Sequence, residues 1–111
     1  MRAREKPALG ELRPIGEGEP IELTKDRLLI GRHRFCDVVL HSPQVAPVHC
    51  QLYVRHFWWY VRDLSGTQDT KVNALPVGES RLVPGDILWI GIRHKYEVCY
   101  DPEALSAMTN E

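Results

Sequence analysis

Short apolar runs, rather than long helical repeats, make up the pattern of hydrophobic and polar positions along this chain. The runs are rich in β-branched and aromatic residues, and clusters of Gly, Pro, Asp and Ser separate them roughly every eight to twelve residues. This spacing is typical of a β-sandwich or a β-barrel. We therefore expect strands within residues 9–15, 20–24, 27–32, 37–40, 49–55, 58–64, 70–74, 75–77, 81–83, 86–91 and 94–100. Residues 102–111 are expected to form either a helical turn or a frayed tail.

Alternation within the runs 49–55 and 58–64 predicts which side chains face the core, because successive residues of a strand point to opposite faces. The side chains expected in the core are Cys50, Leu52, Val54, Trp59 and Val61. Those expected on the outer face are Gln51, Tyr53, Arg55, Trp58, Tyr60 and Arg62. Cross-strand aromatic pairs often only stabilise a sheet, whereas exposed Trp, Tyr and Arg dominate many protein interfaces. Tyr53, Trp58 and Tyr60 are therefore a candidate interface, and both interpretations stay open here.

Composition narrows the class of protein. The chain has 111 residues, of which 43% are hydrophobic and 26% charged, and its formal net charge is −1. These values fit one folded domain, and they supply no overall positive field for nucleic acid or an acidic membrane. The cysteines, Cys36, Cys50 and Cys99, are scattered and odd in number, which favours free thiols in a reducing compartment. With no apolar segment resembling a secretory signal or a membrane span, we expect a cytoplasmic protein.

Five short motifs follow one another in a distinctive order. The first is Gly31-Arg32, followed by Asp37 and an apolar strand; the second is the tetrad 46–49, which ends in His49. The third motif consists of Trp59, Val61, Asp63 and Leu64. The fourth consists of Gly66, Thr67, Gln68, Asp69, Thr70, Val72 and Asn73, and the fifth of Leu82, Gly85, Asp86 and Gly91. Together they resemble the forkhead-associated (FHA) domain family over roughly residues 10–100.

The resemblance implies an all-β fold, an FHA-type (SMAD/FHA-like) β-sandwich of about eleven strands. It also implies non-catalytic binding of phosphothreonine peptides by loops at one end of the sandwich. In the family, the Arg of Gly-Arg and the Ser of Ser-Arg-x-His hold the phosphate, and the Asn of an Asn-Gly loop orients the peptide backbone. By this resemblance, Gly31, His49, Asp63 and Asn73 are structural residues of the motif.

The residues aligned with the phosphate site depart from the family pattern. Arg32 is present, but Ala46 replaces the Ser and has no hydroxyl, and Pro47 has no backbone N–H. Gln68 replaces the Asn, and Asp69 replaces the Gly and adds a negative charge. We therefore expect a degraded phosphothreonine pocket. Arg32 either contacts an anion or pairs with Asp37 across its loop.

Further candidates for peptide or phosphate contact lie in or near the same loops. His33, Arg34 and Ser42 would compensate for the lost groups, and Thr67 and Lys71 would lie on the peptide-facing loop if the resemblance holds. A metal site is a separate hypothesis, because His33, Cys36, His49 and Cys50 are ligand types that zinc prefers. No spacing of nucleophile and base or of paired acids points to an enzyme.

The sequence therefore predicts a non-catalytic protein-interaction module of the FHA type that binds weakly or without phosphate and needs no cofactor. Its partner would be another protein or peptide, and neither nucleic acid nor membrane is expected. The alternatives are a functional phosphothreonine reader with substituted contacts and, third, a metal-binding domain. We expect an N-terminal tail over residues 1–8, the FHA-like domain over 9–101 and a C-terminal tail over 102–111. The oligomeric state and the extent of any longer protein stay open.

Overall fold

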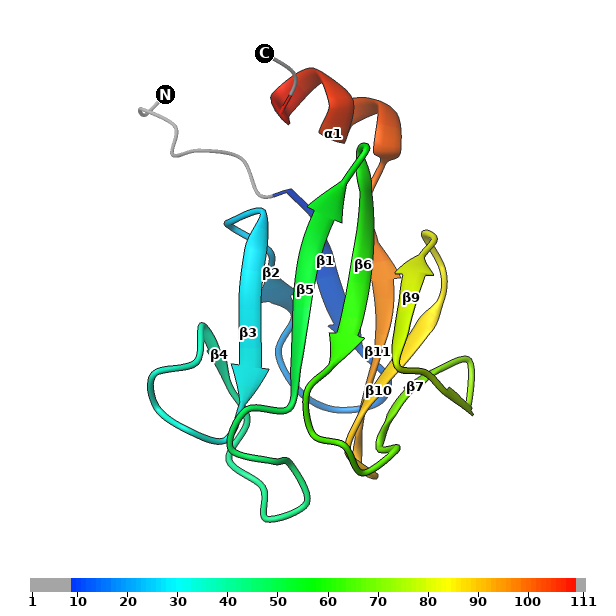
Figure 1. The fold of residues 1–111 in the computed structure, drawn as a ribbon. Coiled ribbons are helices and arrows are strands. Elements are labelled where there is room, and N and C mark those ends of the chain that lie inside the picture. The colour runs from blue at the N-terminus through cyan, green and yellow to red at the C-terminus, as the bar shows by residue number, and fades with distance from the viewer. Residues whose placement is uncertain (1–8, 110–111) are drawn as a thin grey trace.

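The computed structural model describes residues 9–109, which form eleven strands followed by one helix (Figure 1). The expected N-terminal tail, residues 1–8, and residues 110–111 lie outside this described part. The elements are β1 (Glu11–Pro14), β2 (Ile21–Glu22), β3 (Arg27–Gly31), β4 (Val38–Val39), β5 (Cys50–Arg55), β6 (Trp58–Asp63), β7 (Thr70–Val72), β8 (Leu75–Pro76), β9 (Glu79–Leu82), β10 (Ile87–Ile90), β11 (His94–Cys99) and α1 (Pro102–Thr109). Each expected run contains or overlaps one of these strands.

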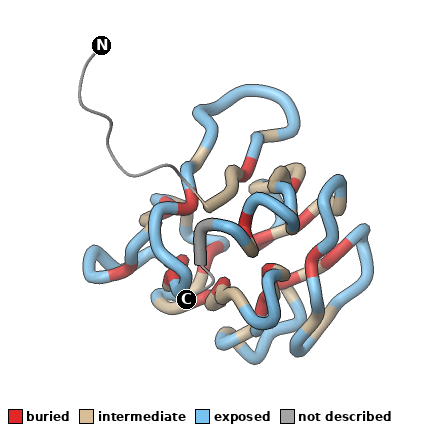
Figure 2. Tube along the Cα trace, turned by 90° about the horizontal axis from the view of Figure 1, so that it is seen from above, coloured by how far each residue is buried: buried red, intermediate tan, exposed pale blue. Residues whose placement is uncertain are grey.

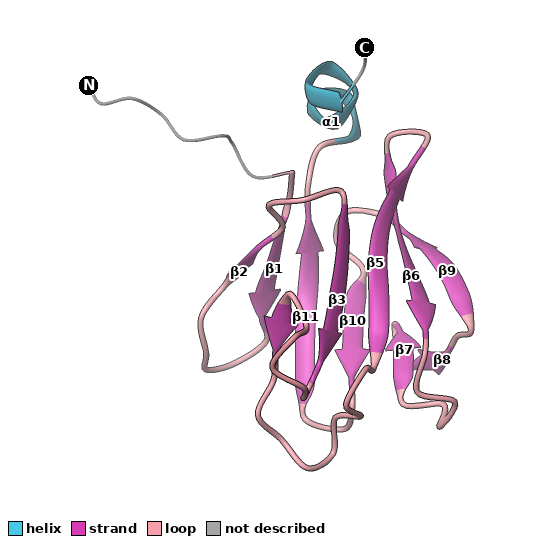
Figure 3. Ribbon diagram, turned by 60° about the vertical axis from the view of Figure 1, so that its left-hand side comes forward, coloured by secondary structure: helices cyan, strands magenta, loops and turns pink. Residues whose placement is uncertain are grey.

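The strands pair into two sheets that lie face to face (Figure 3). One sheet has six strands in the order β2-β1-β11-β10-β7-β8, and the other has five in the order β4-β3-β5-β6-β9. All pairings are antiparallel except that of β3 with β4. The predicted all-β sandwich of about eleven strands is confirmed.

The core lies between the two sheets and is built from alternate residues of their strands (Figure 2). Cys50, Leu52, Trp59 and Val61 are fully buried, as alternation predicts, while Val54 is partly buried against the same cluster. Trp59 is the largest of the fully buried side chains, and its indole N–H donates to the carbonyl oxygen of Leu9 at 3.1 Å. A buried Trp is stable because its polar group is satisfied in this way.

Helix α1 covers one end of the sandwich (Figure 1). Asp101 caps it, because the Asp101 side chain accepts from the amide of Glu103 at 3.0 Å, and Pro102 takes the first helical position. Leu105 is buried in the core cluster, so the helix packs on the domain through this side chain. Of the two expectations for residues 102–111, the structure shows the helical one over residues 102–109.

The loops that follow β3, β4 and β6 lie at the other end of the sandwich, away from α1 (Figure 1). Two glycines let the loop between β4 and β5 approach the strands closely. A Cβ on Gly31 would lie 2.3 Å from the carbonyl oxygen of Pro47, and one on Gly91 would lie 2.9 Å from that of Gln44. Gly91 also has a φ of +73°, a conformation that side chains disfavour. The backbone around residues 44–47 is therefore held tightly against β3 and β10.

Candidate functional site

A shallow pocket of about 290 Å³ lies at the loop end of the sandwich. It is formed where the β4–β5 loop meets the β6–β7 and β10–β11 loops and the end of β3. The lining residues are Arg32, Pro43, Gln44, Val45, Ala46, His49, Thr67, Asp69 and Ile92. The structure thus brings together four of the predicted contact residues, namely Arg32, Ala46, Thr67 and Asp69.

His49 joins two of these loops from a buried position. Its side chain is only 1% exposed, and its Nδ1 accepts from the amide of Ala46 at 3.0 Å. Nε2 lies 3.4 Å from the carbonyl oxygen of Asp69. A ring that accepts at Nδ1 and faces a carbonyl at Nε2 is neutral with its proton on Nε2. Both ring nitrogens are therefore engaged by the backbone of the pocket wall.

The backbone around Ala46 and Pro47 runs beside the end of β3. The amide of Arg32 donates to the carbonyl oxygen of Ala46 at 2.9 Å, and that of His33 donates to Pro47 at 3.0 Å. The single amide N–H of Ala46 is already used by His49, and Pro47 has none. The segment therefore turns carbonyl oxygens, rather than donors, toward its neighbours.

Arg32 is the cation of the pocket. Its side chain is exposed, and its Nε donates to the carbonyl oxygen of Val45 at 2.9 Å. The pairing of Arg32 with Asp37 that the sequence left open is wrong. Asp37 instead contacts Lys25 at 2.5 Å and accepts from the amide of Leu29 at 2.7 Å. The hydrogen bond from Lys25, then that from Leu29, lowers the pKa of Asp37.

The β6–β7 loop is held by hydrogen bonds to Asp63. This carboxylate accepts from the hydroxyl of Thr70 at 2.6 Å, from that of Ser65 at 2.8 Å and from the amide of Gly66 at 2.8 Å. Burial raises the pKa of Asp63, but these hydrogen bonds outweigh it, so the pKa lies below its ordinary value. Within the loop, Thr67 donates from its hydroxyl to the carboxylate of Asp69 at 3.0 Å. The negative charge of Asp69 is thereby fixed beside the pocket.

Several predicted contact residues do not line the pocket. The ring of His33 packs on Phe35 with centroids 4.1 Å apart, and its Nδ1 accepts from the Phe35 amide. Ser42 accepts from the amide of Gln44 and lines a neighbouring hollow instead. Arg34 and Gln68 are exposed, and Gln68 has a φ of +65°. Lys71 lies on β7 with its ammonium 5.0 Å from the centre of the Trp89 ring, on the outer face of the six-stranded sheet.

Pocket residues that the sequence analysis missed come from the loop backbone and from the β10–β11 turn. Pro43, Gln44 and Val45 precede the tetrad that carries the family motif, and Ile92 follows Gly91. Ile92 is 59% exposed. The Pro and Gly beside these residues predict loops, but the lining can be found only once the strand order is known.

The remaining motif residue, Asn73, connects β7 to β10. Its Oδ1 accepts from the amide of Ile87 at 2.9 Å, and its Nδ2 donates to Asp86 at 3.0 Å. The cysteines of the metal hypothesis are buried. The thiol of Cys36 contacts the carbonyl oxygen of Pro47 at 3.3 Å, and burial raises the pKa of Cys50. Among the described residues, no three His, Cys, Asp or Glu side chains are grouped to hold a metal ion.

The candidate interface lies on the outer face of the five-stranded sheet, well away from the pocket. Tyr53 and Tyr60 are stacked, with centroids 5.5 Å apart, and the ring of Trp58 meets Tyr100 edge-on at 6.4 Å. All three predicted rings are half-buried rather than enclosed in the core. They therefore share one accessible surface.

Comparisons with known proteins identify the fold and a family. Residues 15–96 match the family described as "Inner membrane component of T3SS, cytoplasmic domain" (Yop-YscD). No curated protein matches the sequence. Residues 9–109 contain no helix that is long and apolar enough to cross a membrane.

Solved FHA domains share this fold. EmbR of Mycobacterium tuberculosis, in complex with a low-affinity phosphopeptide, is 23% identical with a TM-score of 0.78; the match covers 85% of this chain but only 25% of EmbR. A structure from an analysis of phosphothreonine-dependent FHA domain interactions is 26% identical, with a TM-score of 0.73 and coverage of 84% and 97%. The FhaA FHA domain, complexed with the intracellular domain of Rv3910, is 27% identical, with a TM-score of 0.70 and coverage of 80% and 98%.

Proposed function

This chain belongs to the family of T3SS inner-membrane-component cytoplasmic domains, which is FHA-type, and from that premise we propose that it binds a protein partner without needing phosphothreonine. FHA domains are non-catalytic interaction modules, and the proposal for this chain likewise involves no reaction and no cofactor. The family description also supports a position on the cytoplasmic side.

The observation that carries the proposal is the lack of free donors at residues 46 and 47. Ala46 has no hydroxyl, its amide is bonded to His49, and Pro47 has no amide N–H. A hydrogen bond to a charged group contributes about 1.5–3 kcal/mol, which corresponds to about 10- to 150-fold in affinity. The loss of one such bond would turn a micromolar phosphopeptide ligand into a far weaker one.

The charges of the pocket support the same conclusion. Arg32 has already committed its Nε to the carbonyl oxygen of Val45, and Asp69 places a carboxylate on the same pocket wall. An exposed apolar side chain, Ile92, also lines the pocket. This combination suits an uncharged or apolar segment better than a phosphate.

A phosphothreonine reader is the second candidate, because Arg32 lines the pocket with an exposed guanidinium. Arg forms bidentate hydrogen bonds with phosphate, so this one side chain supplies the strongest single contact such a reader would need. Solved FHA structures named for phosphopeptide complexes add support at the level of the fold.

Titration of a degenerate phosphothreonine peptide library and its unphosphorylated counterpart decides between the two candidates. We expect equal, weak binding of both libraries by the unmodified protein. Arg32→Ala should change neither, and neither should Arg34→Ala, a matched removal of an exposed arginine outside the pocket. Micromolar binding that requires phosphate and disappears only in Arg32→Ala would overturn the proposal in favour of the reader.

A further inference from the structure

Four side chains stand in one row across the outer face of the five-stranded sheet. Arg27 on β3 is paired in register with Tyr53 on β5, Tyr53 with Tyr60 on β6, and Tyr60 with Arg81 on β9. The row therefore begins and ends with an arginine and has two stacked tyrosines at its centre. Residues two positions along each strand point to the same face, so Arg55 and Arg62 flank the row.

The aromatic rings of this face are covered by guanidinium groups. Arg62 lies 5.5 Å from the centre of the Tyr53 ring, and Arg55 lies 5.4 Å from that of Tyr60. Arg81 lies 4.7 Å from the centre of the Trp58 ring. These distances are within the range of cation–π contacts. The contacts hold long, flexible side chains in place while the side chains remain exposed to solvent.

Cross-strand packing that stabilises the sheet explains the aromatic rings on this face, but it does not explain the charged side chains around them. At the outward positions of β3, β5, β6 and β9 there are four arginines and one carboxylate, Glu79. Glu79 is already engaged, since it accepts from the hydroxyl of Tyr53 and lies 3.3 Å from Arg62. The whole chain carries a formal charge of −1, whereas this face carries more positive than negative side chains.

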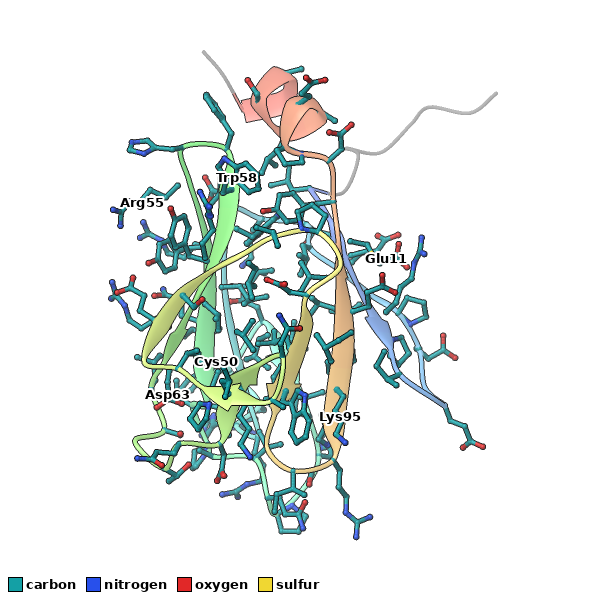
Figure 4. All side chains as sticks on the ribbon, turned by 90° about the vertical axis from the view of Figure 1, so that its right-hand side faces the viewer. Glu11, Cys50, Arg55, Trp58, Asp63 and Lys95 are labelled. Carbon is teal, nitrogen blue, oxygen red and sulfur yellow. The ribbon has the colours of Figure 1, made fainter. Side chains whose placement is uncertain are left out.

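The β1–β2 hairpin, on the other side of the molecule, carries four glutamates against one arginine, Arg13. Glu11 on β1 and Glu22 on β2 are directly paired in the six-stranded sheet, and the loop between these strands carries Glu17 and Glu19. Figure 4 places Glu11 and Arg55 on opposite sides of the sandwich. The domain is therefore electrically asymmetric, with a basic sheet face opposite an acidic hairpin.

We propose that this arginine face, defined by Arg27, Arg55, Arg62 and Arg81, docks an acidic segment of a partner protein. The proposal rests on the proposed function, an interaction module that does not need phosphate, and assigns the partner's chemistry. A guanidinium that stacks on a ring keeps the N–H groups at its edge free to bond carboxylates in its plane. Because the rings have already ordered these side chains, binding costs less conformational entropy.

The same geometry favours an acidic protein segment over a nucleic acid. Nucleic acid on such a surface would stack its bases on open aromatic rings. Here Tyr53 and Tyr60 already stack on each other, at an interplanar angle of 14°, and guanidinium groups lie over them. The groups that remain accessible are the N–H donors at the edges of the guanidinium groups, and carboxylate oxygens are suitable acceptors for them.

The test uses a fluorescein-labelled oligoglutamate peptide and anisotropy titration at low salt. Arg81→Gln should weaken binding roughly fivefold, and the pair Arg55→Gln with Arg81→Gln more than about tenfold. Lys95→Gln is the matched control, because Lys95 also lies over a Trp ring, at 4.1 Å from the centre of Trp89, but on the other sheet. It should leave the affinity unchanged.

Three results would overturn the proposal. They are no binding of oligoglutamate, equal losses in Arg81→Gln and Lys95→Gln, or tighter binding of a single-stranded oligonucleotide through the same arginines. Amide chemical-shift mapping on the unmodified protein gives a second reading should the double variant unfold, and the shifts should fall on β5, β6 and β9. Arg32→Ala should leave oligoglutamate binding intact. A failure of this proposal can therefore be distinguished from a failure of the proposal about the phosphate-independent pocket.

Discussion

The carbonyl oxygen of Pro47 lies where a side chain on Gly31 would begin, since a Cβ there would be 2.3 Å away. The contact joins the end of β3 to the loop that carries the pocket, directly before Arg32. The neighbouring amides of Arg32 and His33 donate to the carbonyl oxygens of Ala46 and Pro47. Gly31, the glycine of the Gly-Arg motif, thus allows the backbone of the β4–β5 loop to pack against the end of β3, and this role does not depend on phosphate.

Gly31→Ala should therefore destabilise the domain by about 1–3 kcal/mol, the usual cost of overpacking a tight site. Gly78→Ala is the matched control, because nothing lies within 4 Å of the added Cβ there and φ is not positive. Its free energy of unfolding should change by no more than about 0.5 kcal/mol. Urea unfolding monitored by tryptophan fluorescence measures both. Equal values for the two variants would show that the β4–β5 loop gives way freely.

His49→Ala removes a side chain that satisfies two backbone groups of the pocket wall. The Ala46 amide loses its acceptor and the Asp69 carbonyl loses its ring donor, so we expect a cost of about 1–3 kcal/mol. His41→Ala, at an exposed histidine near the same loop, should change the unfolding midpoint little. An unchanged midpoint in His49→Ala would remove the structural role and reopen the ligand hypothesis for this residue.

Asp63 should make the domain sensitive to acid. Its pKa is lowered in the folded state, so its carboxylate contributes stability that is fully present above its unfolded pKa of about 3.9. That contribution is lost as the pH falls through the lower, folded pKa. Asp63→Asn should therefore be less stable than the unmodified protein at pH ~7, with the difference narrowing below pH ~4.

Thr70→Val tests the cause of this behaviour, because it removes the 2.6 Å hydrogen bond to Asp63 and keeps the side chain's shape. The acid-dependent part of the stability should shrink in this variant, as measured by urea unfolding over a pH series. A pH profile in Thr70→Val identical to that of the unmodified protein would show that this hydroxyl does not hold the Asp63 carboxylate.

The strands were predictable because alternation in this chain is regular and the turns between strands are rich in Gly, Pro and Asp. In the structure Lys71 points outward, since Thr70 and Val72 on either side of it are buried. The family resemblance instead suggested a peptide-facing place for Lys71. Its contact with Trp89 depends on the pairing of β7 with β10, which the sequence does not reveal.

Helix α1 was harder to predict because isolated helices shorter than about 12–15 residues are barely stable in water. Its eight residues are stabilised by tertiary contact through Leu105, in addition to the Asp101 cap. The pocket was also hard to predict from the sequence, because its lining depends on tertiary structure. Arg32 and Ala46 were found from their motifs, whereas Ile92 joins them only because β10 and β11 turn at the same end of the sandwich.

Phosphate recognition should be recoverable if the pocket is degraded as proposed. The triple change Ala46→Ser, Pro47→Arg and Asp69→Gly restores a hydroxyl and an amide N–H and removes the carboxylate. The scaffold should tolerate it, since His49 and Gly91 bond the backbone carbonyl of Asp69 rather than its side chain. Likewise, Pro47 accepts from His33 and Cys36 through its carbonyl oxygen, which arginine retains.

We expect the triple variant to prefer phosphothreonine peptides by at least about tenfold, the equivalent of one charged hydrogen bond. Adding Arg32→Ala should abolish the preference, because Arg32 lines the pocket, whereas position 47, where the new arginine stands, does not. Titration with matched phosphorylated and unphosphorylated peptides measures both variants. If the triple variant folds normally yet shows no preference, the substitutions at 46, 47 and 69 are not what prevents phosphate binding. The arrangement of Arg32, held by the Val45 carbonyl, would then be the cause.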